Sequence, residues 1–140
     1  MEPDRPLPTP MTPEAKPYWD GLKSRTLMLP RCGDCGHTFF YPRMLCPACG
    51  SRSIGWVQAS GKGRLHAFGI AHQTFNKAYK VPPPYVLAMI ELEEGPRMLS
   101  NLVNVTPDPK TIKCDMPVEV VFHTLTDDVT LPLFQPAGAR

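Results

Sequence analysis

Four of the five cysteines in this 140-residue chain form two Cys-x-x-Cys pairs, Cys32/Cys35 and Cys46/Cys49. Ten residues separate the pairs, and a glycine follows each of them. A Cys-x-x-Cys turn brings two sulfurs to one side of the backbone, and the small residue lets backbone N–H groups fold toward them. Two such turns facing each other predict one structural zinc ion bound by four thiolates. Such a site is closed, because it leaves no position for a substrate or an activated water.

Three other uses of these cysteines compete with zinc. Iron accepts the same four thiolates, so the spacing alone leaves an iron site open. Two disulfides need an oxidising compartment, yet nothing at the N-terminus resembles a signal peptide. A redox-active Cys-x-x-Cys normally occurs once, inside a βαβ pattern, and neither condition holds. Since no apolar run approaches the roughly 18 residues of a membrane span, we expect a cytoplasmic protein without a membrane segment.

The elements that position the cysteines can be predicted on both sides of each pair. Between the pairs we expect a short hairpin, Thr38–Tyr41 and Arg43–Leu45 around Pro42, which makes residues 31–53 a zinc ribbon. Thr12 suits a helix N-cap and Pro13 the first helical position, so a helix is expected to run to about residue 23. With a strand at residues 26–29, it forms a lead-in unit over residues 12–30. The proline-rich residues 1–11 are expected to be a disordered or extended tail.

Beyond the ribbon, repeated β signals are separated by turn-forming residues. The clearest of these strands places Val86, Ala88, Ile90 and Leu92 on one face. The expected strands are Gly55–Ala59, Gly63–His72, Tyr85–Glu93, Arg97–Val103, Pro117–Leu125 and Val129–Phe134. This pattern favours a mainly β fold, in which an N-terminal helix and a zinc ribbon precede a small OB-fold-like barrel of five or six strands over residues 54–135. Residues 136–140 are expected to be a frayed tail.

Charge is unevenly distributed along the chain, although the net charge is only +2. Residues 51–80 contain five basic residues and no acidic ones, whereas residues 81–140 contain four basic and eight acidic residues. The basic stretch is a candidate face for binding a compact anion, with an ordinary solvated surface as the alternative. Its residues are Arg52, Lys62, Arg64, Lys77 and Lys80.

Catalytic motifs are not recognisable in the sequence, which has no nucleophile elbow, phosphate loop or His-Glu-x-x-His. His66 and His72 are six residues apart, about 20 Å along a strand, which is too far for shared ligation. Cys114 is unpaired, and a buried or merely tolerated small residue is the simpler interpretation of it. The sequence therefore offers no active site of its own.

The order of several longer motifs resembles a known family. These motifs are Tyr18–Leu22, Cys32–Arg43, Cys46–Ser51, Trp56–Gly63, Pro83–Arg97 and Met116–Phe122. Together they resemble the acyl-CoA-associated family that joins a rubredoxin-like zinc ribbon to an OB-fold, over roughly residues 12–135. All four ligand positions of the ribbon are present.

This resemblance implies a non-catalytic accessory subunit of a thiolase-superfamily enzyme in lipid or steroid metabolism. The implied partner is a thiolase, an acyltransferase or an aldolase that shortens the side chain of a steroid-like CoA ester, and some members pair with hydratases instead. In a hetero-oligomer of this kind the chain is expected to stabilise the thiolase-like subunit and to help shape its CoA site. The five basic residues named above are then candidate CoA contacts. The resemblance does not choose among the partners or reactions.

Two aromatic regions are candidates for the partner interface, because Trp and Tyr are frequent interface anchors and a proline run lowers the entropy lost on docking. One is the apolar side of the predicted helix, and the other is the loop before Tyr85. The candidate residues are Tyr18, Trp19, Leu22, Phe75 and Tyr79.

A single-stranded nucleic-acid-binding module is the alternative function, because OB-folds bind single strands with a basic groove and stacking aromatics. Nucleic-acid-binding domains usually have a pI above about 9. The pI of this chain is near 8.3 and its second half is acidic, so nucleic acid is the less favoured partner.

Overall fold

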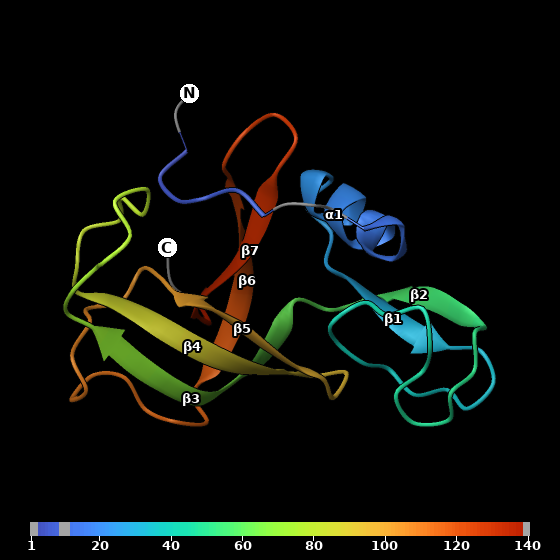
Figure 1. Cartoon of the computed structure of the whole chain (residues 1–140). Helices are drawn as coiled ribbons and strands as arrows, with labels where there is room; N and C mark the ends of the chain where they lie inside the picture. The colour runs from blue at the N-terminus through green and yellow to red at the C-terminus, as the bar shows by residue number, and fades with distance from the viewer. Residues whose placement is uncertain (1–2, 9–11, 139–140) are drawn as a thin grey trace.

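The computed structural model describes residues 3–8 and 12–138 (Figure 1). A two-stranded sheet with its cysteine loops lies on one side of the molecule, a five-stranded closed barrel lies on the other, and one short helix packs near their junction. This arrangement confirms the predicted mainly β class, with a ribbon followed by an OB-like barrel. Among the described residues, no helix is long and apolar enough to cross a membrane.

The helix begins as the sequence predicts, but in two steps. A 3-10 turn, η1 (Pro13–Ala15), leads directly into helix α1 (Lys16–Lys23). Thr12 is extended and a proline follows it, although its side chain makes no capping hydrogen bond. Tyr18 and Leu22, one helical turn apart, are only 6% and 0% exposed and face the core.

The ribbon sheet pairs strand β1 (Met28–Cys32) with strand β2 (Ile54–Gln58) in antiparallel register, from Met28 opposite Gln58 to Cys32 opposite Ile54. We expected β2 to be the first barrel strand, but it completes the ribbon instead. Residues 38–45, all of which the structure describes, do not form the expected hairpin. Thr38 instead makes an isolated antiparallel β-bridge with Arg31 of β1. The ribbon is therefore built around β1 and β2, with the cysteine loops between them.

The barrel contains β3 (Lys62–Ala71), β4 (Tyr85–Leu92), β5 (Arg97–Leu102), β6 (Pro117–Thr124) and β7 (Thr130–Pro136). Its strand order is β3-β4-β5-β7-β6, and it closes by pairing β6 with β3. Only the β5–β7 pair is parallel. Residue 136, which we expected in a frayed tail, belongs to β7, while residues 139–140 lie outside the described part of the chain.

The barrel core is filled from alternate positions, except at one irregularity in β3. On β4 the predicted inner face is confirmed, since every second residue from Val86 to Leu92 is at most 2% exposed. On β3, a bulge between Leu65 and Ala67 shifts the register by one residue. Leu65 therefore packs in the core before the bulge, whereas Phe68 and Ile70 pack against it afterwards.

Helix, ribbon and barrel share one core rather than forming separate units. Tyr18 and Leu22 of α1 belong to the same buried cluster as barrel residues such as Ile90 and Phe134. The guanidinium of Arg25, just after α1, donates a 2.6 Å hydrogen bond to the carbonyl of Phe122 in β6. The position of the ribbon relative to the barrel is thus set by packing as well as by chain connection.

Two glycines of β3 provide a test of this packing. A Cβ added at Gly63 would lie 2.5 Å from the carbonyl oxygen of Glu91, whereas one added at Gly69 meets nothing within 4 Å. We expect Gly63→Ala to lower the free energy of unfolding by about 1–3 kcal/mol, as overpacking typically does. Gly69→Ala is the matched control and should change it by no more than about 0.5 kcal/mol. Urea unfolding measures both, and equal midpoints would contradict this account of β3.

Candidate metal centre and partner surfaces

The four sulfurs of the two Cys-x-x-Cys pairs lie together, all within 4.8 Å of one another. Cys32 Sγ is 3.6 Å from Cys49 Sγ, and Cys35 Sγ is 3.6 Å from Cys46 Sγ. A disulfide needs about 2.05 Å, and none of the five cysteines is in a disulfide bond. Zn–S bonds of about 2.3 Å in a tetrahedron place neighbouring sulfurs about 3.8 Å apart, so the observed arrangement fits zinc.

The two halves of the site have the same local structure. The Gly36 N–H donates to the Cys32 carbonyl at 3.0 Å, and the Gly50 N–H donates to the Cys46 carbonyl at 2.9 Å. Both glycines have φ near +77°, a backbone conformation that a side chain strongly disfavours. The glycine after each pair is therefore needed to close the turn that holds the sulfurs.

Backbone N–H groups stabilise thiolates at the buried cysteine of each pair. The N–H groups of Cys35 and Asp34 each lie 3.4 Å from Cys32 Sγ, and against the effect of burial they lower the pKa of Cys32 to about 6. Burial raises the pKa of Cys46, but N–H groups including that of Ala48 outweigh it and leave this pKa below its usual value. A metal needs deprotonated sulfur, which the backbone favours at Cys32 and Cys46. At Cys35 and Cys49, the N–H groups of His37 and Ser51 are outweighed by burial and the neighbouring sulfurs, which raise the pKa of both thiols.

Comparison with protein families agrees with this geometry. Residues 19–55 match the ChsH2 rubredoxin-like zinc ribbon domain, and residues 56–123 match the ChsH2 C-terminal OB-fold domain. The chain belongs to the ChsH2-type DUF35 family. Its four cysteines hold one structural zinc ion.

Known relatives carry names of several kinds. A probable enoyl-CoA hydratase alpha subunit from Thermomonospora curvata is 35% identical over 131 residues, which are 93% of this chain but only 40% of that relative. A DUF35 domain-containing scaffold protein from Methanocaldococcus jannaschii is 34% identical over 112 residues, 79% of this chain and 77% of the relative. A solved structure titled Ltp2-ChsH2(DUF35) aldolase superposes with a TM-score of 0.81 at 33% identity, covering 94% of this chain and 99% of that one.

In this DUF35 chain, the five predicted anion-binding residues are all exposed but do not form one face. Arg52 lies in the ribbon, Lys62 and Arg64 begin β3, and the two lysines at positions 77 and 80 lie in the β3–β4 loop. The rest of β3, from Lys62 or Arg64 to Ala71, separates the last two groups by roughly 20–30 Å along the strand. Arg64 is also paired with Glu91 at 3.3 Å. The basic stretch of the sequence is thus divided among three places.

The predicted helix interface needs correction. Tyr18 and Leu22 are core residues, so they cannot act as exposed anchors, and Trp19 is half-buried. In the β3–β4 loop, Phe75 is 91% exposed, whereas Tyr79 is half-buried with its ring 5.0 Å from that of Tyr85. Of the two predicted regions, the loop offers the more exposed aromatic side chain.

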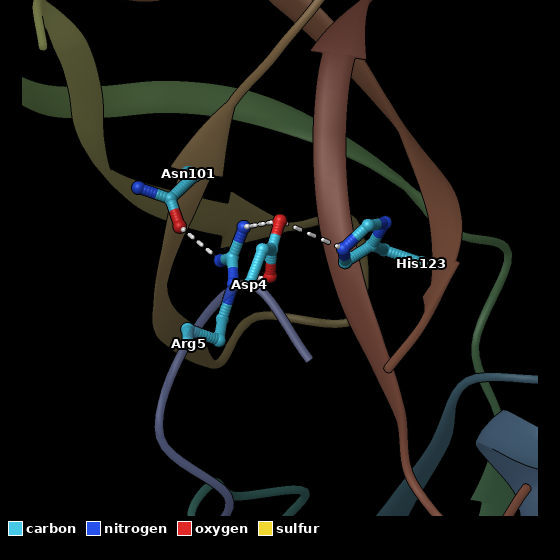
Figure 2. A network of polar contacts seen from close by, with 4 residues as sticks. All are labelled: Asp4, Arg5, Asn101 and His123. Atoms are coloured by element: carbon cyan, nitrogen blue, oxygen red, sulfur yellow. Dashed lines mark hydrogen bonds and ion pairs between the residues drawn. The ribbon is translucent and has the colours of Figure 1, made fainter. Parts of the chain in front are cut away.

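The described part of the N-terminal segment, residues 3–8, is held against the barrel (Figure 2). Arg5 is hydrogen-bonded to Asp4 at 2.9 Å and to Asn101 of β5 at 3.2 Å, and its guanidinium lies 5.4 Å above the ring of Tyr79. Asp4 also lies 3.4 Å from His123 of β6. A disordered or extended tail was expected here, and these contacts place the described part of it against the barrel, while residues 1–2 and 9–11 lie outside the described chain.

Two exposed apolar regions were not predicted. One is a groove of about 500 Å³ between the start of the helix and the ribbon, where Met44 is 66% exposed and Trp56 forms part of the wall. The other is the outer face of β4 and β5, with Leu87 and Leu99. A signal for the second was available, because Leu87 and Met89 make β4 apolar on both faces, whereas a strand with one solvated face alternates.

Zinc removal provides the test of the metal centre. Cys46→Ser should lose the ion and unfold the ribbon, since structural zinc contributes on the order of 10–16 kcal/mol in finger peptides. Cys114→Ser changes an exposed cysteine outside the cluster and should retain about one zinc per chain. Elemental analysis with thermal unfolding measures both. Well-folded protein without metal, or equal zinc content in both variants, would contradict the assignment.

The N-terminal segment should detach when its arginine is removed. Arg5→Ala loses the contacts with Asn101 and Tyr79, and we expect faster thermolysin cleavage near Leu7 at a stability cost of about 1 kcal/mol. Arg43→Ala, at an exposed ribbon position, is the control. Arg5 lowers the pKa of Asp4, with burial opposing this shift and His123 assisting it. The Arg5–Asp4 contact is therefore complete above the usual carboxyl pKa and is lost as pH falls through the lowered value. Cleavage at the wild-type rate would contradict this role.

Proposed function

We propose that this chain is a non-catalytic accessory subunit of a thiolase-superfamily acyl-CoA enzyme. The observation that carries the proposal is its likeness to the solved Ltp2-ChsH2(DUF35) aldolase, of which it covers 99% of the matched chain at 33% identity. The relative from Methanocaldococcus jannaschii is named a scaffold protein, which agrees with a structural role. The alignment with it covers most of both chains, so the likeness extends to the whole of that relative's fold. The partner we propose is a thiolase-like aldolase, and the substrate is a CoA ester bound by the complex.

The chemistry of the described residues supports a role without catalysis. The metal centre has four protein ligands, so it leaves no coordination position for a substrate. The Asp4–His123 contact is part of the network that holds the N-terminal segment. Arg5 is hydrogen-bonded to the same Asp4 carboxylate in this network (Figure 2). Among residues 3–8 and 12–138, the four cysteines are the one group of three or more His, Cys, Asp or Glu side chains that lie close enough to hold a metal ion. The chemistry is accordingly assigned to the partner.

The surface supports binding to another protein. Tyr41, Met44 and Leu45 lie between the cysteine pairs and are 51%, 66% and 46% exposed. Large apolar side chains gathered on an exposed surface typically mark interaction sites. For the CoA ester, we propose that Lys77 and Lys80 in the β3–β4 loop are the candidate phosphate contacts, since both are exposed and lie on the same loop.

Single-stranded nucleic acid is the second candidate, because the β3–β4 loop carries the exposed ring of Phe75 beside Lys77. OB-folds commonly use this loop in binding oligonucleotides. Tight binding of a single-stranded DNA oligomer that weakens steeply with salt would favour this function over the accessory role.

Co-expression with the Ltp2 aldolase subunit tests the accessory role. We expect one complex on size exclusion, an isolated chain that is inert toward acyl-CoA esters, and an aldolase subunit that is less soluble or less active alone. Charge reversal at both Lys77 and Lys80 should raise KM for the CoA substrate more than it lowers kcat. The matched control is Lys110→Glu with Lys113→Glu, on exposed residues elsewhere in the chain. Turnover by the isolated chain, or an aldolase equally active and soluble without it, would overturn the proposal.

A further inference from the structure

The outer surface of β4 and β5 is apolar where a solvated barrel is normally polar. Leu87 and Leu99 are 44% and 56% exposed on neighbouring strands. In the register, Leu99 lies opposite Met89, two residues from Leu87 on the same face. The two leucines are therefore diagonal neighbours, about 7–8 Å apart at the backbone and within reach of a single partner side chain. We call this surface the β4–β5 face.

Strand β3 extends this surface with residues that have small side chains or none. Ala67 lies opposite Met89 and Gly69 opposite Leu87, and both small residues are exposed. A side chain added at Gly69 would meet nothing within 4 Å. The β4–β5 face is thus flanked by an open, shallow strip against which another backbone can pack closely.

The ribbon borders the same face. Tyr41 is 51% exposed, and its hydroxyl accepts a 3.3 Å hydrogen bond from the backbone N–H of Leu99. This contact satisfies a donor of β5 in the part of the strand where β7 does not pair with it, because the β5–β7 pairing is confined to Leu102 and Phe134. Tyr41 of the ribbon is therefore held directly beside Leu99 at the margin of the β4–β5 face.

A row of charges crosses the strands at one end of the face. Arg64, Glu91 and Arg97 are direct neighbours on β3, β4 and β5. Glu91 lies 3.3 Å from Arg64 and 4.0 Å from Arg97, and both arginines are more than half exposed. One carboxylate serves two guanidinium groups, so the row carries an excess positive charge. A binding partner with a carboxylate beside an apolar side chain complements it.

We propose that the β4–β5 face, bordered by Tyr41, is the surface on which this chain docks onto its thiolase-like partner subunit. The partner contributes an apolar side chain to Leu87 and Leu99 and a carboxylate to Arg97. This inference rests on the proposed function and adds the location and chemistry of the contact. It replaces α1 as the interface, because Tyr18 and Leu22 are buried.

The same observations disfavour nucleic acid on this face. Single strands bind OB-folds by stacking bases on aromatic rings along a cationic groove. Here Leu87, Met89 and Leu99 supply aliphatic side chains at the centre of the corresponding strands. The rings of Tyr41 and Tyr85 lie only toward the margins of the face. The N-terminal segment is also tied to Asn101 at the far end of β5 (Figure 2). An aliphatic face closed at one end suits a protein partner better than a polyanionic strand.

The test measures the affinity of the full-length zinc-loaded chain for the Ltp2 aldolase subunit. Leu99→Asp and Leu87→Asp should each weaken binding at least about 30-fold, as expected for central apolar anchors. Leu7→Asp is the matched control, since Leu7 is 42% exposed in the N-terminal segment, and it should bind like wild type. Arg97→Glu should weaken binding as well, and more at low salt. Unchanged zinc content and melting temperature establish that the variants are folded.

Each result of this experiment decides between separate ideas. If the wild type binds and both leucine variants bind as tightly as Leu7→Asp, the docking face is wrong while the accessory role stands. If the wild type does not bind, the proposed function and this inference are both overturned. Loss of binding in Phe75→Asp alone would move the interface to the β3–β4 loop. If the leucine variants abolish self-association or binding of single-stranded DNA, a second copy or a nucleic acid occupies the face, and the inference fails.

Discussion

The bonds from one zinc ion to four thiolates are the main connection between the two cysteine loops. Cys32 and Cys46 are buried, but Cys35, Cys49 and most residues of the loops are exposed, so apolar burial contributes little there. Each loop makes its own turn around a positive-φ glycine, and few hydrogen bonds join the two loops, among them one from the Ser51 hydroxyl to the Asp34 carboxylate. In so small a unit, a metal typically supplies the free energy that a hydrophobic core cannot.

The strands β1 and β2 pass this restraint on to the rest of the molecule. β1 ends at Cys32 and its register continues to Leu29, which is fully buried in the shared core. On leaving β2, the chain is held by the N–H of Ala59, which donates to the carbonyl of Leu27 at 2.8 Å before β3 begins. The ribbon, the helix and the barrel therefore support each other, and a change at the metal centre reaches the barrel through packed residues.

Much of this arrangement could be predicted because it depends on local sequence. The Cys-x-x-Cys spacing specifies the ligand set, and the alternation at residues 86–92 identifies an inner face that the structure confirms. The β3 bulge was not predictable, because β-pairing of Leu65 and Ala67 with β4 is settled by a partner strand more than twenty residues away. The pairing of β2 with β1 rather than with the barrel is non-local in the same way.

The burial of the helix aromatics and the placement of the N-terminal segment were missed for a related reason. Tyr18 has the composition of an interface anchor, and only the position of Phe40, with ring centres 5.2 Å apart, shows that the chain itself covers it. The proline-rich start has the composition of a free tail, yet Arg5 has a specific polar partner 96 residues away in Asn101. Composition indicates what a side chain can contact, while the fold determines whether that contact comes from the same chain.

The metal centre and the β4–β5 face are physically linked through a single loop. Tyr41 lies between Cys35 and Cys46, so the zinc ion restrains both ends of the segment that carries it. Its hydroxyl then meets the backbone of Leu99, which presents its side chain on the face. A closed metal site has no chemistry to perform, but it can lower the conformational entropy of a nearby surface before a partner arrives. The zinc ribbon thus acts as a rigid margin of the barrel face, which is a structural reason for one chain to contain both.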